Sequence, residues 1–512
     1  AVVTMPQSSS DVGERFFVGV ADGHTGTLTF TSTSGAPGQL SARGNTYAAM
    51  RIGHTTGNSS GIVNIGGGTN VDIGWIFGQG SGTRQLNVLD GRFNVLSDNT
   101  AKRLNGIDVT VGRNGALWVE GTITSKSDFE SSYAPGATLT ANGGRACFRT
   151  SVVYDPMVGS AQTGTLITVR EIAPPPADGD LMVVSAHPDD EGIFFGGTLP
   201  YYTQVRNAKT VHVSMTSGDW ARPPEVREEE LRNADWVYGL RSEPLFPRFK
   251  DAPTHSGSNN GGYPNSIDAT WDWWNDGELD GYGSPGEDAA AGRQRAIDTL
   301  ATYIRTYKPE VIVTHDLDGE YGHDNHKATA IAVIEAYSQA ADPGYVDGLD
   351  PWQSQKLYLH LYDQNRLFHD FWELTSIDAS GDGVADATPR LVADLGLDEH
   401  VSQGRPDVST VYRDGENYDS WPSEWWGLYA STVGPDTIAD PFTIRGTLYD
   451  GWARGDFFEN VFSVPEPSTL ALGAVGLAGL LCYLAAGRSR CVRRRFAAAS
   501  RPRHPTNDRL TA

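Results

Sequence analysis

Cysteine is nearly missing from this chain: its 512 residues include only Cys147, Cys482 and Cys491. Three thiols cannot build the disulfide framework of a small secreted domain or a thiolate zinc cluster, so any metal site must use other ligands. Cys147 stands alone in the globular part of the sequence. We expect it to be a small buried residue rather than a nucleophile.

Positive charge is also scarce, with 40 Lys and Arg against 63 Asp and Glu and a formal net charge of -23. This balance leaves no broad basic surface, so we expect no nucleic-acid partner, and it disfavours a strongly anionic polymer as substrate. The length exceeds that of a usual single domain, and a hydrophobic content of 39% is enough for real cores. Two or more domains are expected.

Long apolar runs are rare, with one exception near the C-terminus. Residues 470–486, "LALGAVGLAGLLCYLAA", follow a Pro-Glu-Pro turn and precede a cluster of arginines. At about 1.5 Å per residue such a helix is just long enough to span a bilayer core, and the arginines suit its cytoplasmic side. We therefore predict a transmembrane helix at 470–486.

The order of these parts over residues 464–496 resembles the PEP-CTERM sorting signal of exported bacterial proteins. The resemblance implies export, membrane retention through the helix, and cleavage near Pro465–Pro467 by exosortase-type sorting machinery. The product would be in the cell envelope or outside the cell. The eight Arg and one Asp after Pro467 carry a net charge of +7, so their removal would take the charge from -23 to -30.

Residues 1–172 are rich in Gly, Ser, Thr and Asn, and strand-sized alternating segments recur between Gly- and Asn-bearing turns. A loose repeat runs through "RIGHTTGNSSGIVNIGGGTNV", "WIFGQGSGTRQLNVLDGRFNV" and "VTVGRNGALWVEGTI". Such spacing suits rungs that each bury a face on the next one. We predict an all-β domain, with a β-solenoid favoured over a jelly-roll sandwich.

A Pro-rich linker at 173–179 separates this domain from a second one at 180–460. Apolar strands are expected at 181–186, 210–218 and 309–316, and helices at 222–240, 287–308 and 324–340. This alternation predicts an α/β domain on a parallel sheet, where side chains at the carboxyl ends of strands line the ligand crevice. "HPDDE" and "HDLDGEYGHDNH" both follow strands directly, which puts the two polar clusters on the same rim.

These clusters contain the ligand types that zinc accepts, imidazole and carboxylate. His187 and Asp190 lie three residues apart on a turn, and His323 or His326 would complete a two-His, one-Asp set. Asp189 would then be a general base acting on water activated by the metal. Alternatively, Asp189 or Asp190 caps a helix that begins near residue 192, and the later histidines lie on the surface. The two clusters together favour the metal site.

"AHPDDE" followed by "THDLDGEYGHDNH" resembles the LmbE/PIG-L family of metal-dependent de-N-acetylases. "TSGDWARPPEVREEELRNADWVYGL" and "DEHVSQ" extend the resemblance over roughly residues 178 to 410. It implies a Rossmann-like fold, a divalent cofactor (Zn²⁺, with Fe²⁺ or another metal as the alternative), and removal of acetyl from an N-acetylated amino sugar. The resemblance assigns the metal to His187, Asp190 and His326, catalysis to Asp189, His323 and Tyr321, and weaker substrate contacts to Arg227 and His400.

In these roles Asp189 deprotonates water, and His323 stabilises the oxyanion or protonates the leaving amine, with help from Tyr321. The chain departs from the family pattern H-x-D-H at Asn325, where an Asp normally orients the catalytic histidine. A neutral amide stabilises an imidazolium less well, and Asp324 or Asp318 could substitute.

Two insertions carry further candidates. Residues 250–288 hold three tryptophans among acids and glycines, so Trp273 could stack on a sugar ring, or the loop could pack on its own tryptophans. Residues 378–386 resemble a calcium loop, but Pro389 stands at the twelfth position in place of the usual Glu. That argues against an EF-hand and leaves a lone weak calcium site as an alternative. "WPSEWWGLY" at 421–429 is expected to be core packing.

The sequence thus predicts an exported zinc hydrolase that removes acetyl from an N-acetylglucosamine-type glycan or glycoconjugate. One alternative is a non-catalytic, metal-stabilised glycan-binding surface protein, which Asn325 favours. The other is an amidase acting on a different N-acyl conjugate.

Overall fold

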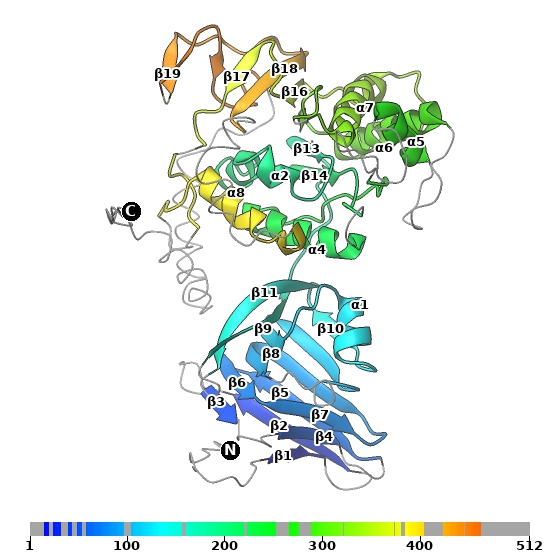
Figure 1. Ribbon diagram of the computed structural model, residues 1–512, viewed down its shortest axis with the longest axis vertical. Coiled ribbons are helices and arrows are strands. Elements are labelled where there is room, and N and C mark those ends of the chain that lie inside the picture. The colour runs from blue at the N-terminus through cyan, green and yellow to red at the C-terminus, as the bar shows by residue number, and fades with distance from the viewer. Residues whose placement is uncertain are drawn as a thin grey trace, which may run out of the picture.

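The computed structural model describes most of the chain up to residue 461 (Figure 1). The described residues are 15–19, 24–31, 39–42, 49–53, 58–96, 104–155, 160–219, 223–251, 266–275, 288–320, 322–372, 374–379, 384–403, 423–444 and 446–461. The predicted sorting segment at 464–496, with its helix at 470–486, lies outside them.

The N-terminal domain is built almost entirely of strands. Its elements are β1 (Arg15–Val18), β2 (Thr25–Thr31), β3 (Gln39–Ala42), β4 (Ala49–Gly53), β5 (Ser60–Gly66), β6 (Thr69–Ile73), β7 (Trp75–Gln79), β8 (Arg84–Val95), β9 (Asp108–Glu120), α1 (Lys126–Asp128), η2 (Phe129–Tyr133), β10 (Leu139–Asn142), β11 (Arg145–Asp155) and β12 (Ser160–Arg170).

These strands stack as the rungs of a β-solenoid. β2, β5, β8 and β9 pair in parallel, and so do β1, β4 and β7 on another face. Thr29, Asn64 and Asn87 occupy equivalent positions on three successive rungs, and Asn87 donates to Asn64 over 2.9 Å. Successive parallel pairing of this kind distinguishes a solenoid from a jelly roll, whose strands run antiparallel.

The solenoid ends in an antiparallel cap. β12 pairs antiparallel with both β9 and β11, so β11 is the last strand of the sheet on the side of the second domain (Figure 1). The alternating apolar residues of the rungs form one continuous core, which includes Ile65, Val88 and Val111.

The second domain contains β13 (Leu181–Ser185), α2 (Asp190–Ile193), α3 (Thr198–Pro200), η3 (Tyr201–Val205), β14 (Thr210–Ser214), α4 (Pro224–Tyr238), α5 (Ile267–Asn275), α6 (Ala289–Tyr307), β15 (Val311–Thr314), α7 (Asp324–Ala341), β16 (Lys356–His360), β17 (Arg366–Phe368), α8 (Pro389–Leu397), η4 (Val401–Gln403), β18 (Trp425–Ser431), β19 (Phe442–Ile444), β20 (Thr447–Tyr449) and β21 (Ala453–Arg454).

Within the described residues, the main sheet has the order β14-β13-β15-β16-β18-β17-β21. The first four strands are parallel, and β18 runs antiparallel to both of its neighbours. The sheet is therefore mixed, not purely parallel as the sequence predicted. The three strands and three long helices expected from the sequence are present, each within a few residues of its expected ends.

Alternating residues of the central strands face two separate cores. Leu181 and Val183 of β13 pack toward α4 and α8, whereas Met182 and Val184 pack toward α5, α6 and α7. Helices on both faces make β13 and β15 continuously buried, which is why their sequences are unbroken apolar runs. The carboxyl ends of these two strands carry the polar clusters.

Helix α4 is fixed to the sheet by a buried hydrogen-bonded chain. His212 of β14 contacts Asp235 of α4 through Nδ1 at 2.9 Å and Ser185 of β13 through Nε2 at 3.2 Å. The connectivity is that of a Ser-His-Asp triad, but all three residues are at most 1% exposed. We interpret it as a structural connection that locks the helix to two strands.

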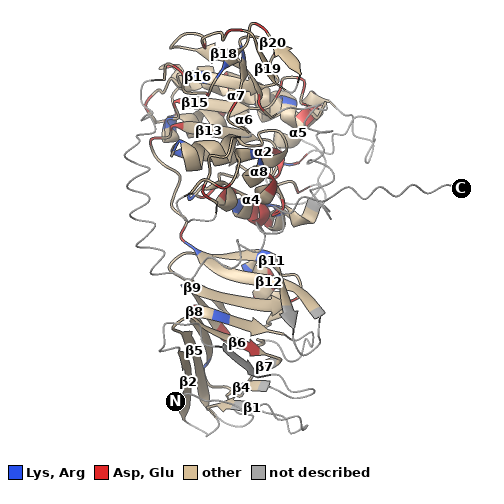
Figure 2. Cartoon of the chain, turned by 90° about the vertical axis from the view of Figure 1, so that its left-hand side faces the viewer, with Lys and Arg blue, Asp and Glu red and all other residues tan. Residues whose placement is uncertain are grey.

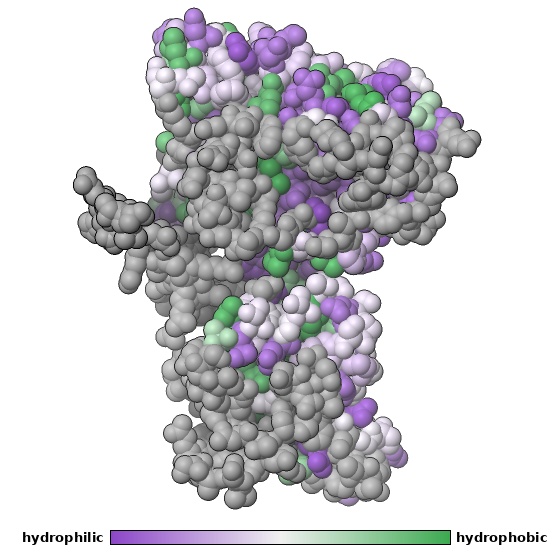
Figure 3. All heavy atoms as spheres, in the orientation of Figure 1, coloured by the Kyte–Doolittle hydropathy of each residue, from purple (hydrophilic) through white to green (hydrophobic). Residues whose placement is uncertain are grey.

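The described surface is mostly polar. On the face shown in Figure 3, hydrophobic residues occur in small separate groups. No helix among the described residues has the length and apolar character needed to cross a bilayer.

Candidate metal and catalytic site

The "HPDDE" turn folds so that its acids have different surroundings. α2 begins at Asp190, and Asp189 occupies the N-cap position without making a side-chain capping bond. The Asp190 carboxylate points back toward the strand end, where one oxygen accepts the backbone N–H groups of Ala186 (3.1 Å) and His187 (2.7 Å). Neither aspartate is therefore a helix cap in the ordinary sense.

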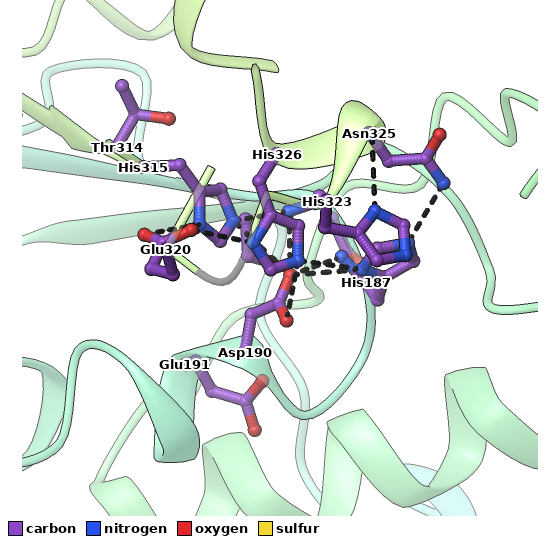
Figure 4. Close-up of polar contacts among 12 residues, drawn as sticks. His187, Asp190, Glu191, Thr314, His315, Glu320, His323, Asn325 and His326 are labelled. Atoms are coloured by element: carbon purple, nitrogen blue, oxygen red, sulfur yellow. Dashed lines mark hydrogen bonds and ion pairs between the residues drawn. The ribbon is translucent and has the colours of Figure 1, made fainter. Parts of the chain in front are cut away.

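Donor atoms from three residues converge in front of this turn (Figure 4). His187 Nδ1 and His326 Nε2 lie 3.3 Å apart. Asp190 places one carboxylate oxygen 3.3 Å from His187 Nδ1 and the other 3.4 Å from His326 Nε2. Ligand atoms about 2.0–2.1 Å from a tetrahedral zinc ion lie about 3.3 Å from one another. The three residues thus fit a divalent cation in both chemistry and spacing.

His315 is a fourth histidine at this site, and the sequence did not single it out. Its Nε2 lies 3.2 Å from Asp190 and accepts the Ala186 N–H over 2.9 Å. Asp190, His315 and His326 form one group of donors close enough to share an ion, and His187, His323 and His326 form another. Because His315 Nε2 already contacts both the Ala186 N–H and an Asp190 oxygen, we assign His315 to the support of Asp190 rather than to the ligand set.

The Glu320 carboxylate contacts three histidines at this site and orients their rings. It contacts the Nδ1 atoms of His326 (2.6 Å), His315 (3.0 Å) and His360 (3.0 Å) and accepts the Asp316 N–H (3.2 Å). A carboxylate that accepts a hydrogen bond from Nδ1 of a histidine fixes the tautomer of that ring. The Nε2 lone pair of His326 therefore faces the other two proposed ligands, and we call the set of His187, Asp190 and His326 the ligand triangle. Glu320 itself has a φ of 50°, a strained backbone conformation of the kind found at functional sites.

The buried charges of the site shift one another's pKa values. Burial opposes protonation of His187, but Asp251 and Asp190 outweigh it and raise its pKa to about 9. Burial likewise opposes protonation of His315, and Glu320 with Asp190 raises its pKa to about 9. The neighbouring histidines hold the pKa values of Asp190 and Glu320 well below their usual range despite burial. The pocket therefore favours positive charge, whether protons or a metal cation.

Asp189 immediately precedes Asp190 in a strained turn, with a φ of 122°. Its backbone N–H donates to Glu191 over 2.9 Å, and its carboxylate lies 3.5 Å from the Arg227 guanidinium. Burial raises the pKa of Asp189, and Arg227 opposes that rise. A base whose pKa is raised by burial binds a proton more strongly, which suits a group that must take one from water.

His323 forms the N-cap of α7, and its Nδ1 accepts the Asn325 N–H over 3.2 Å. The neutral ring therefore carries its proton on Nε2 and can donate it in a hydrogen bond. The ring centroid lies 4.7 Å from that of His187 and 4.8 Å from that of His326. This geometry places a hydrogen-bond donor next to the ligand triangle.

The Asn325 side chain turns away from His323. Its Nδ2 donates to Asp251 over 2.8 Å and lies 2.9 Å from His187 Nε2, which is itself 3.2 Å from the same Asp251 oxygen. Asn325 and His187 thus both direct hydrogens at Asp251. Asp318 is exposed and Asp324 pairs with Lys327, so the substitutes suggested by the sequence are engaged elsewhere.

Several predicted residues have different surroundings from those expected. Arg227 contacts Asp189 and the Pro188 carbonyl, and His400 is 1% exposed and contacts Glu191 over 2.7 Å, so both residues support the turn. Trp273 is 2% exposed in α5, which favours the alternative that this segment packs on its own tryptophans. Tyr321 and the middle of the calcium-like loop lie outside the described residues. Burial raises the pKa of Cys147 to about 11, as expected of an inert thiol.

The fold is a helix-covered α/β sheet, and its site contains His and Asp groups that could hold a metal ion. Residues 182–337 match the family model for PIG-L, described as GlcNAc-PI de-N-acetylase, and residues 463–490 match the PEP-CTERM protein-sorting motif. The 1D-myo-inositol 2-acetamido-2-deoxy-alpha-D-glucopyranoside deacetylase of Thermomonospora curvata is 30% identical over 233 residues, which are 42% of this chain and 75% of the relative. The chain belongs to the PIG-L family and is a hydrolytic N-deacetylase.

Two further comparisons cover less or are more distant. A deacetylase of the same description from Frankia casuarinae is 31% identical over 186 residues, covering 35% of this chain and 57% of that protein. The solved structure of N,N'-diacetylchitobiose deacetylase from Pyrococcus horikoshii is 14% identical, covers 49% of this chain and 82% of its own, and has a TM-score of 0.32. The sorting motif is of a kind that accompanies export and membrane anchoring.

Proposed function

We propose that this protein is an exported, zinc-dependent hydrolase that removes the acetyl group from an N-acetylated amino sugar in a glycan or glycoconjugate. The observation that carries the proposal is the triangle of His187, Asp190 and His326, with contacts of 3.3 to 3.4 Å between their donor atoms. His323 lies next to two of these residues, and Asp189 directly precedes Asp190. The named substrates of the related deacetylases, which are N-acetylated glucosamine derivatives, support the substrate class.

His187, Asp190 and His326 would hold the metal. When bound, the cation would supply Lewis acidity, which polarises an amide carbonyl and lowers the pKa of water. Two imidazoles and a carboxylate suit Zn²⁺ and also Fe²⁺.

Asp189 would take one proton from the attacking water as the water oxygen bonds to the acetyl carbon. Its carboxylate needs to be ionised for this step, and Arg227 at 3.5 Å stabilises that form. The same carboxyl would then give the proton to the amide nitrogen as the carbon–nitrogen bond breaks. The products are acetate and the free amine of the sugar.

His323 would stabilise the negative oxygen of the tetrahedral intermediate through its Nε2–H. The sequence left open whether this residue is an electrophile or an acid. Because the Asn325 N–H already occupies Nδ1, a second ring proton would oppose a backbone donor. The contact therefore favours a neutral, hydrogen-bonding imidazole and leaves proton transfer to Asp189.

A screen for acetate release tests the proposal. Purified protein with stoichiometric Zn²⁺ should release acetate from N-acetylglucosamine oligomers or from an N-acetylglucosaminyl conjugate. Zinc binding without acetate release from any amino sugar would favour the glycan-binding alternative. Release from a non-sugar N-acyl conjugate alone would favour the amidase alternative. Fractionation of cells that make the full chain tests export, and protein confined to the cytosol would contradict that part.

A further inference from the structure

We propose that the N-terminal solenoid is a working part of the deacetylase, because its last strand holds in place the two segments that position Asp189. The inference rests on the proposed function, since it assigns the catalytic base to Asp189.

The junction between the domains is made of partly buried ion pairs from β11. Arg145 pairs with Glu229 of α4, whose side chain is 6% exposed, and Arg149 pairs with Glu399, which follows α8 and is 7% exposed. Figure 2 shows the matching pattern of charge, with acidic residues on α4 above basic residues at β11. Buried carboxylates are costly to leave unpaired, so these contacts fix the orientation of the two domains.

Main-chain contacts make the junction stiffer than ion pairs alone would. The Phe148 N–H of β11 donates to Glu229 over 3.3 Å, and the Phe148 carbonyl accepts from Asn233 over 2.8 Å. The Ala173 N–H of the linker donates to the Arg241 carbonyl over 2.9 Å, beyond the end of α4. Domains joined in this way should move as one body rather than swing on a linker.

The first connection to Asp189 runs through α4. Glu229 is held on the outer side by the solenoid, and Asp235 is held on the inner side by His212 of the sheet. Arg227, two residues before Glu229, reaches the Asp189 carboxylate. Helix α4, which carries the Arg227 guanidinium, is therefore held by contacts from both domains.

The second connection runs through the turn after α8. Glu399 is bound by Arg149, and the next residue, His400, bonds Glu191 over 2.7 Å. Glu191 in turn accepts the Asp189 N–H over 2.9 Å. Ser402 joins the two connections, because its N–H and hydroxyl both donate to Glu230 of α4.

A cleft of about 670 Å³ runs along this junction between α1, β10 and α4. Its charged lining residues are paired, Arg145 with Glu229 across the domain boundary and Arg232 with Glu228 within α4. The cleft is thus part of the domain interface, on the outer side of α4 and away from the metal ligands.

The test uses the full chain with Arg149→Met, Glu399→Gln and the double variant. Arg293→Met is the matched control, because Arg293 pairs with Glu335 between α6 and α7 on the opposite face of the sheet. Arg149→Met should lower kcat about tenfold, since small displacements of a catalytic group cost large rate factors. KM and zinc content should stay unchanged, and amide exchange in a peptide spanning 186–194 should become faster. The control variant should match the wild type in kcat, KM, zinc content and amide exchange.

If the pair acts as a unit, Glu399→Gln should also lower kcat, and the double variant should be no worse than the poorer single one. Glu399→Gln keeps the side-chain shape, so it tests the inference even if Arg149→Met fails to fold. Wild-type kcat and wild-type exchange at 186–194 in both variants would overturn the inference and leave the proposed function intact. A wild-type protein that binds zinc but releases no acetate would overturn the function, while the exchange measurement would still test the connection.

Discussion

The Glu320 carboxylate contacts Nδ1 of the buried His326 over 2.6 Å. This contact determines which nitrogen of the His326 ring faces the ligand triangle. Carboxylates behind metal-binding histidines raise ligand basicity and fix ring orientation. Glu320 does the same for His315, which braces Asp190. One carboxylate thereby supports two of the three proposed ligands.

Replacement of Glu320 should weaken metal binding before it affects the fold. Glu320→Gln keeps the volume but leaves one acceptor oxygen and no charge for three imidazoles, so zinc affinity should fall by about 10- to 100-fold. Competition with a chromogenic chelator measures this directly. Glu335→Gln on the exposed side of α7 is the control, and equal affinity in both variants would contradict the role of Glu320.

A carboxylate exchange tests the pairing of Asp251 with Asn325. Asn325→Asp alone would put two carboxylates about 2.8 Å apart, where the amide now donates, and should weaken zinc binding through repulsion. Asp251→Asn alone replaces the charged acceptor of the His187 N–H with a neutral, weaker one and should also weaken zinc binding. The double variant restores one acid and one amide and should bind better than either single variant. A double variant no better than the worse single one would refute the pairing.

The Arg227 guanidinium should set the acid limb of the pH–rate profile. It stabilises the ionised form of Asp189, so in Arg227→Met the pKa of Asp189 should rise and the limb of kcat/KM should move to higher pH. Arg227→Lys keeps the charge and should show a smaller shift. An unmoved acid limb in Arg227→Met would show that the two side chains are not coupled.

Metal-free protein should lose stability as pH rises through the neutral range. His187 and His315 titrate at about 9 in the folded state, above the unfolded value of about 6.5, so their contribution is complete below pH 6.5 and is lost as pH passes 9. A shift of this size is worth about 3 kcal/mol for one imidazole. Melting temperatures of the metal-free protein should fall over this window, and those of the zinc-loaded protein should fall less. A metal-free melting temperature that is constant from pH 6.5 to 9 would refute this electrostatic account.

Much of the architecture could be predicted from local patterns. The buried strands β13 and β15 read as apolar runs, and α4, α6 and α7 as amphipathic segments with recognisable ends. The sequence did not predict helix α5, because its nine residues are flanked by glycine-rich and acidic segments typical of a loop. Its buried residues include Trp271, Trp273 and Trp274. The antiparallel strand β18 was expected only as core packing, since pairing direction is a long-range property.

The site residues also divide into those that local sequence patterns predicted and those that they did not. His187, Asp190 and His326 are visible because the two motifs each follow a strand. His315 and Glu320 were within the quoted stretch "HDLDGEYGHDNH", and a histidine that directly ends a buried strand was the available signal for the first. His360 ends the buried strand β16 and offered the same signal, whereas Asp251 carries no local pattern. Both residues reach the site because separate segments of the chain end at the same sheet edge.

The central claim is that Asp189 works on water at a metal held by His187, Asp190 and His326. The most direct test is acetate release from an N-acetylated amino sugar by zinc-loaded wild type and by zinc-loaded Asp189→Asn. The account predicts that both proteins bind one zinc ion, that the wild type releases acetate, and that the variant loses at least about a hundredfold in kcat. Equal acetate release by the two zinc-loaded proteins would contradict it.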